Sequence, residues 1–186
     1  MPEHRLNIHN CKPIVFDQRN RAWRNRMYSN HGDASQTIAS SGSVPTLCAD
    51  VVATMKGMNN IDPHVLAEQA VEWGCRTYNT GTTYSFFEKV ARHYDFKRFV
   101  ATHDFDDMRE CLDLGGYVIC HMKPFSLWWP ATGPYVLAWK CDDDYVYCVT
   151  TSRRDRREKQ RIKNFQEQAN SFFCFYPDTL ELEENE

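Results

Sequence analysis

The chain has 186 residues, of which 42% are hydrophobic, 13% aromatic and 25% charged, and its net charge is −3. This length and apolar content exclude wholesale disorder and fit one domain with its own core. No apolar run reaches the ~20 residues of a membrane span, and the polar first thirty residues do not resemble a signal peptide. We therefore expect a cytoplasmic protein that has no membrane partner.

Charge is distributed unevenly along the chain. Residues 178–186 carry five acids and no Lys or Arg, so removing this −5 from the total of −3 leaves residues 1–177 at +2. We predict one domain over 1–177, which includes an irregular arm over 1–36, and an acidic tail over 178–186. Acidic residues interrupt the basic run 153–163, which favours a solvated surface over a nucleic-acid site. We interpret the arginines of the arm in the same way.

The eight cysteines suggest a disulfide framework at first, but no C-x-x-C pair and no export signal accompany them. We therefore expect reduced, mostly buried thiols that act as small hydrophobic groups. A zinc site is the alternative, although the spacing of its candidate ligands matches no standard pattern. These candidates are Cys120, His121, Cys141 and Cys148. Our prediction is a protein with no metal and no cofactor.

Apolar residues recur with helical spacing over residues 44–57. Ser43 is the expected N-cap, Pro45 falls in the first turn, and Gly57 ends the helix. A second helix is expected from Pro63, after an Asp62 cap, to Gly74.

Two further helices are expected before the strands begin. One starts at Ser85, which forms a capping box with Glu88, and the other covers about 104–114. Short apolar strands follow at 117–122, 135–141, 145–149 and 172–176. Because helices come first and strands second, the predicted class is α+β, with N-terminal helices packed on an antiparallel sheet.

The segment that indicates most about chemistry is Q-T-I-A-S-S-G-S-V-P-T at 36–46. A small residue after a glycine, at the start of a buried helix, is a suitable place for a nucleophile. The residue here is Ser43, and a serine hydroxyl also needs an adjacent base.

This segment resembles the nucleophile motif S-S-G-C-G-P-T of papain-like cysteine peptidases of the bacteriocin-leader-processing type. The similarity is to their short stand-alone bacterial and phage relatives, and it covers roughly residues 13–177. Other motifs that carry it are the Trp23 arm, Asn79–Thr82, the Ser85 helix start, Gly115–Tyr117 and Phe172–Phe175. The resemblance implies a papain-like α+β fold in a bacterial cell or a phage-infected host.

The resemblance also implies that the catalytic triad has been lost. The family's cysteine falls on Ser43, its histidine on Pro134, and its acid on Thr150. Its oxyanion glutamine corresponds to Gln18, with Gln36 as a second candidate. Without a base, a serine lacks the proton acceptor that triad chemistry requires.

We therefore expect a pseudoenzyme that binds a small anionic, nucleotide-like or peptide ligand in the former catalytic groove. The candidate ligand-binding residues are Ser43, Val44, Lys123, Trp128, Trp129 and Tyr135. One alternative is a residual hydrolase that uses Ser43 with His121. Another is a protein–protein module, or a homo-oligomer, that works through the arginines and the acidic tail.

Overall fold

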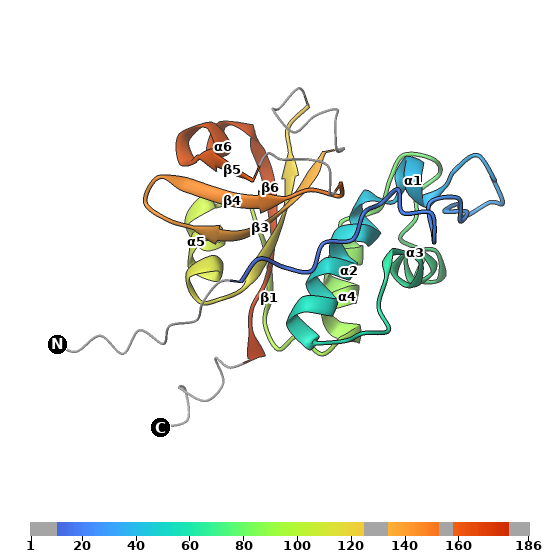
Figure 1. The fold of residues 1–186 in the computed structure, drawn as a ribbon, viewed down its shortest axis with the longest axis horizontal. Helices are drawn as coiled ribbons and strands as arrows, with labels where there is room; N and C mark the ends of the chain where they lie inside the picture. The colour runs from blue at the N-terminus through green and yellow to red at the C-terminus, as the bar shows by residue number, and fades with distance from the viewer. Residues whose placement is uncertain (1–10, 125–133, 153–157, 179–186) are drawn as a thin grey trace.

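The computed structural model describes residues 11–124, 134–152 and 158–178. Four helices lead the chain, and the later part alternates between strands and helices (Figure 1). The elements in order are α1 Ile38–Ser41, α2 Ser43–Lys56, α3 Pro63–Glu72, α4 Ser85–His93, β1 Phe99–Thr102, α5 Phe105–Asp113, β2 Tyr117–Met122, β3 Tyr135–Cys141, β4 Tyr145–Val149, β5 Lys159–Arg161, α6 Ile162–Gln168 and β6 Ala169–Phe175.

The strands form one six-stranded sheet in the order β1-β6-β2-β3-β4-β5, and every neighbouring pair is antiparallel. Helices α1 to α4 lie on one side of this sheet, and α5 and α6 lie on the other (Figure 1). The predicted α+β class, with N-terminal helices on an antiparallel sheet, is confirmed.

Helix α2 is buried along most of its length, which matches its apolar sequence. Gly57 follows it with a left-handed φ of 60°, as expected for a C-cap. The predicted cap at Ser43 is wrong, because Gly42 occupies the N-cap position and Ser43 is the first helical residue. A side chain does not fit at Gly42, since its Cβ would lie 2.7 Å from the Ile38 carbonyl oxygen. The Ser43 hydroxyl is therefore not used to cap the helix.

The predicted capping box of α4 is also wrong. Tyr84 is the N-cap without a side-chain hydrogen bond, and the Ser85 hydroxyl lies 2.8 Å from that of Thr83. By contrast, Asp62 caps α3 as predicted, because its carboxylate accepts a 2.9 Å hydrogen bond from the Val65 N–H.

Two hydrophobic clusters fill the two sides of the sheet. The cluster beneath α2 and α4 is called here the aromatic face; Phe87 stacks on Phe173 within it, with ring centroids 4.0 Å apart. The cluster beneath α5 and α6 is called the thiol face, because five of its members are cysteines. These are Cys111, Cys120, Cys141, Cys148 and Cys174.

All eight cysteines are free and seven of them are buried, as predicted. Cys120 packs on the thiol face, whereas its neighbour His121 stacks on Tyr135 of the aromatic face. Consecutive strand residues point to opposite sides, so these two side chains cannot share a metal ion. No group of three or more His, Cys, Asp or Glu suited to a metal occurs within the described ranges.

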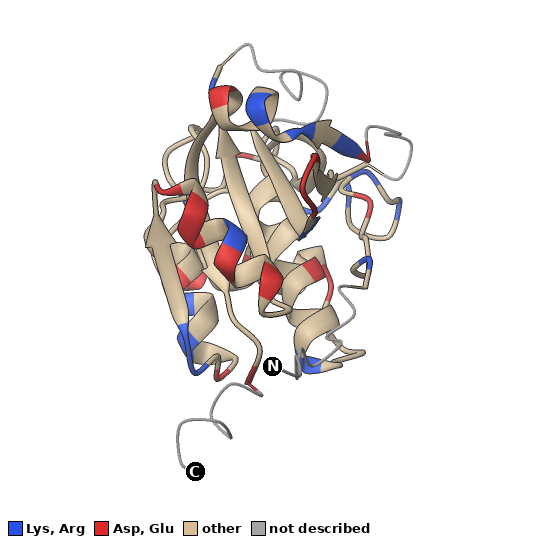
Figure 2. Ribbon diagram, turned by 90° about the vertical axis from the view of Figure 1, so that its left-hand side faces the viewer, with Lys and Arg blue, Asp and Glu red and all other residues tan. Residues whose placement is uncertain are grey.

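The outer surface of α5 is acidic. Its exposed residues include Asp106, Glu110 and Asp113, and Figure 2 shows these acidic bands on the side opposite to α2 and α3. Across 11–124, 134–152 and 158–178, no helix is long and apolar enough to cross a membrane.

Candidate functional site

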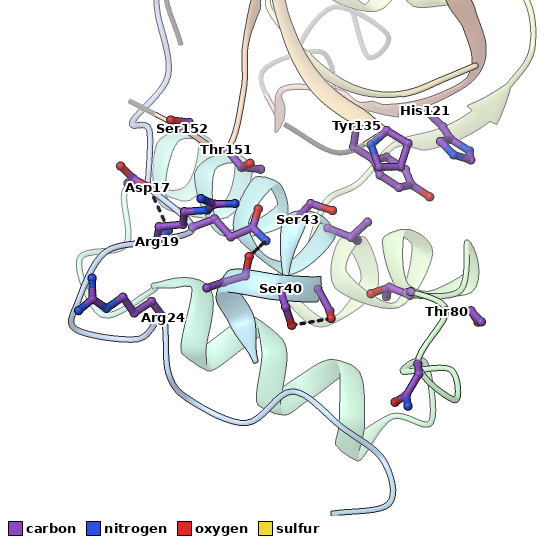
Figure 3. A pocket seen from close by; sticks show the side chains of 18 of the residues that line it. Asp17, Arg19, Arg24, Ser40, Ser43, Thr80, His121, Tyr135, Thr151 and Ser152 are labelled. Atoms are coloured by element: carbon purple, nitrogen blue, oxygen red, sulfur yellow. Dashed lines mark hydrogen bonds between the residues drawn. The ribbon is translucent and has the colours of Figure 1, made fainter. Parts of the chain in front are cut away.

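A pocket of about 880 Å³ opens where α2 begins (Figure 3). The N-terminal arm, the α1–α2 junction, the 79–84 turn, β2, β3 and the segment after β4 all contribute to it. Its lining residues are Asp17, Gln18, Arg19, Arg24, Ala39, Ser40, Ser41, Ser43, Val44, Asn79, Thr80, Gly81, Thr82, Tyr84, His121, Pro134, Tyr135, Thr151 and Ser152.

Ser43 lies near the middle of this pocket in the view of Figure 3, between Arg19 and Tyr135. It is the first residue of a 14-residue helix whose start no side chain caps. Such a helix end carries a partial positive charge. Among the described residues, no hydrogen bond joins the Ser43 hydroxyl to a histidine.

Three rings form what we call the aromatic end of the pocket: Tyr84, His121 and Tyr135. His121 stacks on Tyr135, with centroids 4.4 Å apart and planes 10° apart, and its Nδ1 is hydrogen-bonded to the Tyr84 hydroxyl. Burial lowers the pKa of His121 below its usual value, so its imidazole is neutral at pH 7. His121 is therefore oriented by Tyr84 and Tyr135.

Pro134 and Thr150 are the positions that the sequence resemblance aligns with a catalytic histidine and acid. Pro134 lines the pocket, and its carbonyl accepts a 2.6 Å hydrogen bond from the Met122 N–H. Thr150 is not among the lining residues; its hydroxyl donates to the Ser152 carbonyl and accepts from the Ser152 N–H, both at 3.3 Å. Thr150 therefore stabilises the chain turn after β4.

Gln18 lines the pocket, but its amide group is turned toward α1. The side-chain nitrogen donates to the Ile38 carbonyl at 2.8 Å and to the Ala39 carbonyl at 3.1 Å. A carbonyl only accepts hydrogen bonds, so both amide hydrogens are committed to α1. The second candidate, Gln36, accepts hydrogen bonds at its Oε1 from Arg76 and Ser41.

Arg76 forms a buried support beneath this region, with only 3% of its surface exposed. Its guanidinium donates to the Tyr28 carbonyl at 3.0 Å, the Gly81 carbonyl at 2.8 Å and the Gln36 Oε1 at 3.0 Å. It also lies 4.5 Å from the centre of the Tyr28 ring. Arg76 thus ties the 79–84 turn to the chain that leads into α1.

Two arginines of the N-terminal arm, Arg19 and Arg24, also line the pocket. From the sequence we expected both on a solvated surface and not at the site. In Figure 3 the Arg19 side chain extends toward Ser43, whereas that of Arg24 points away from it. No ion pair found within the described ranges includes Arg19 or Arg24.

The structure brings together only some of the predicted ligand-binding residues. Ser43, Val44 and Tyr135 line the pocket, but Lys123 does not; it is exposed and its N–H donates to the Gln168 carbonyl at 2.7 Å. Trp128 and Trp129 lie outside the described residues, as do 153–157 and 179–186. Tyr84 was missed by sequence reasoning.

The remaining described histidines do not line the pocket. His64 and His93 lie on α3 and α4, and His31 and His103 lie in loops. His121 is therefore the one described histidine at this site.

The arrangement of the helices, sheet and pocket defines a papain-like α+β fold. It is similar to the crystal structure of the peptidase domain of Streptococcus ComA, a bi-functional ABC transporter involved in a quorum-sensing pathway. The two share 14% sequence identity with a TM-score of 0.55, over 75% of this chain and 93% of that one. No protein-family model and no curated protein matches the sequence.

Proposed function

We propose that this chain is a degenerate, peptidase-like protein that binds a small ligand in the Ser43 pocket and does not hydrolyse peptides. The observation that carries the proposal is that Ser43 faces a pocket of about 880 Å³ with no described histidine hydrogen-bonded to its hydroxyl. A serine becomes nucleophilic when a base accepts its proton. The pocket keeps the size of a small-molecule site.

Two other residues support the loss of hydrolysis. Pro134, which the family resemblance aligns with the catalytic histidine, has no side-chain proton acceptor. The Gln18 amide hydrogens, which would have to face a developing oxyanion, both donate to α1 carbonyls.

A probe for serine nucleophiles tests the loss of hydrolysis. We expect a fluorophosphonate to label the wild-type protein no more than it labels Ser43→Ala. Ser35→Ala is the matched control, because Ser35 is exposed and does not line the pocket. Labelling that disappears only in Ser43→Ala would overturn the proposal.

Ligand binding is tested with a variant that fills the pocket. Small molecules that raise the melting temperature of the wild type should lose this effect in Ser43→Trp, because the indole occupies the centre of the pocket. The shift should survive in Ser35→Trp. A shift that is equal in all three proteins would mean that the ligand binds elsewhere.

The second candidate function is a Ser43–His121 hydrolase. It is favoured by one observation, that both residues line one pocket and that burial keeps His121 neutral and able to accept a proton. Against it, the His121 Nδ1 is already hydrogen-bonded to Tyr84. Turnover of peptide or ester substrates that is abolished by both Ser43→Ala and His121→Gln would establish this alternative.

A further inference from the structure

The two ends of the pocket differ in chemistry. Figure 3 shows Arg19 and Asp17 on one side of Ser43, and Tyr135 and His121 on the other. A ligand that spans the pocket therefore meets a guanidinium at one end and aromatic rings at the other.

The aromatic end offers a ring that is already immobilised. Tyr84 is 43% exposed and lines the pocket, so part of its surface is open to a ligand. Its ring packs edge-on against Phe173 at 4.9 Å and against His121 at 5.5 Å, and its hydroxyl is hydrogen-bonded to His121. A flat ligand ring can contact this surface without a further entropy cost for ordering Tyr84.

The other end offers a cation that no described acid neutralises. Arg19 forms no ion pair within the described ranges, and its guanidinium has the planar geometry that pairs with phosphate. The opposing charge here is Asp17, whose Oδ1 accepts a 2.9 Å hydrogen bond from the Arg19 backbone N–H. Figure 3 shows the Asp17 side chain at the outer side of Arg19, farther from Ser43.

Hydroxyl groups line the space between the two ends. Figure 3 shows Ser43 and Thr151 in this part of the lining, and a hydroxyl can both donate and accept hydrogen bonds. Such groups suit a sugar, which presents hydroxyls of its own.

We propose that the ligand is a nucleoside monophosphate, with its base against Tyr84 and His121, its sugar beside Ser43, and its phosphate on Arg19. This inference rests on the proposed function, because it names the class of ligand for the same pocket. The order of the three lining chemistries, aromatic, hydroxyl and cationic, matches the order of base, sugar and phosphate in such a molecule.

Isothermal titration calorimetry with the full chain tests this assignment, using AMP, UMP, adenosine and inorganic phosphate as separate probes. We expect a mononucleotide to bind at least about tenfold more tightly than either adenosine or inorganic phosphate, because it contacts both ends at once. Its affinity should fall as the salt concentration rises.

Charge-matched variants locate the phosphate. Arg19→Gln should weaken mononucleotide binding about tenfold and leave adenosine binding unchanged, since one charge-assisted contact is lost. Arg21→Gln is the control, because Arg21 is an exposed neighbour in the same arm and does not line the pocket.

Ring variants locate the base. Tyr84→Leu should weaken mononucleotide and adenosine binding by a similar factor without changing that of inorganic phosphate. Tyr84→Phe keeps the ring and should retain most of the affinity, which separates ring contact from a folding defect. Tyr78→Leu removes a more exposed tyrosine outside the pocket and should have no effect.

The outcomes separate this inference from the proposed function. If no mononucleotide binds and an aromatic carboxylate such as N-acetyltryptophan does, the nucleotide assignment is wrong and the ligand-binding proposal stands. Equal losses in Arg19→Gln and Arg21→Gln would also overturn the assignment, because the attraction would then be a general charge effect. Fluorophosphonate labelling that depends on Ser43 would overturn the proposed function.

Discussion

The aromatic face and the thiol face of the sheet are built from side chains of different size. On the aromatic face, Phe87 of α4 stacks on Phe173 of β6. Tyr135 belongs to this core and also lines the pocket. On the thiol face, five cysteines belong to the core between the sheet and helices α5 and α6, and none of the residues of this face lines the pocket. Large rings that carry a polar atom can belong to a core and to a site at once, whereas small buried thiols only fill space.

The largest effect on stability is expected from removing one buried phenylalanine ring from each face. Phe87→Ala and Phe165→Ala both empty fully buried positions and should each lower the free energy of unfolding by about 4 kcal/mol. Only Phe87 contacts Tyr135, whose ring stacks on His121. An NMR titration of His121 should therefore show its pKa move back toward the usual value in Phe87→Ala alone. Equal movement in both variants would break the distinction between the faces.

The next largest effect is a loss of stability at alkaline pH, which we expect from the buried cysteines of the thiol face. Burial raises the pKa of Cys120 and Cys148 well above the usual thiol value, so both stay protonated in the folded state. In the unfolded chain they ionise near pH 8.5, so stability is fully present below that pH and is lost as pH rises. By about pH 9 each such thiol should lower the free energy of unfolding, measured with urea, by about 1 kcal/mol.

A double variant tests whether the thiols cause this loss. Cys120→Ala with Cys148→Ala should be less stable at pH 7 but should lose less stability between pH 7 and 9 than the wild type does. Cys11→Ala is the matched control, because Cys11 is exposed. An unchanged pH dependence in the double variant would assign the alkaline loss to other groups.

A further comparison adds one methyl group on each side of the molecule. A Cβ at Gly116 would lie 2.5 Å from both the Cys111 Sγ and the Phe175 carbonyl oxygen, and one at Gly42 meets Ile38 in a similar way. Each alanine should destabilise the protein by about 2 kcal/mol, measured by thermal unfolding. Ligand affinity should change only in Gly42→Ala, since Gly42 precedes Ser43. A neutral Gly116→Ala would mean that the backbone at Gly116 yields easily.

The strongly patterned elements could be predicted from the sequence. The apolar spacing of α2 and the Asp62-Pro63 start of α3 are local signals, and both elements formed as expected. Strand β5 carries three polar residues, of which only Gln160 is buried, so its sequence contains no alternating pattern. β1 was missed because none of its four residues is fully buried, and α1 because it has only four residues.

Part of the site was predictable from the sequence, because the family resemblance pointed to Gln18, Pro134 and Tyr135 as well as to the segment before α2, and all of these line the pocket. Ser43 and Val44 follow the S-S-G motif and do line the pocket. Arg19 and Tyr84 reach it from distant segments, and nothing in their local sequence distinguishes them from surface residues. Lys123 follows β2 directly but does not line the pocket, which only the fold reveals.

The hydrogen bonds of Arg76 bear on when the wall of the pocket becomes ordered, relative to the ligand binding that we propose. Its three hydrogen bonds connect Tyr28, Gly81 and Gln36, so one wall of the pocket is assembled when the chain folds. Moving that wall later would leave a buried cation without its acceptors. The order that a mobile loop acquires on meeting a ligand is here acquired during folding, so the ligand that we propose would meet a surface whose shape is already set.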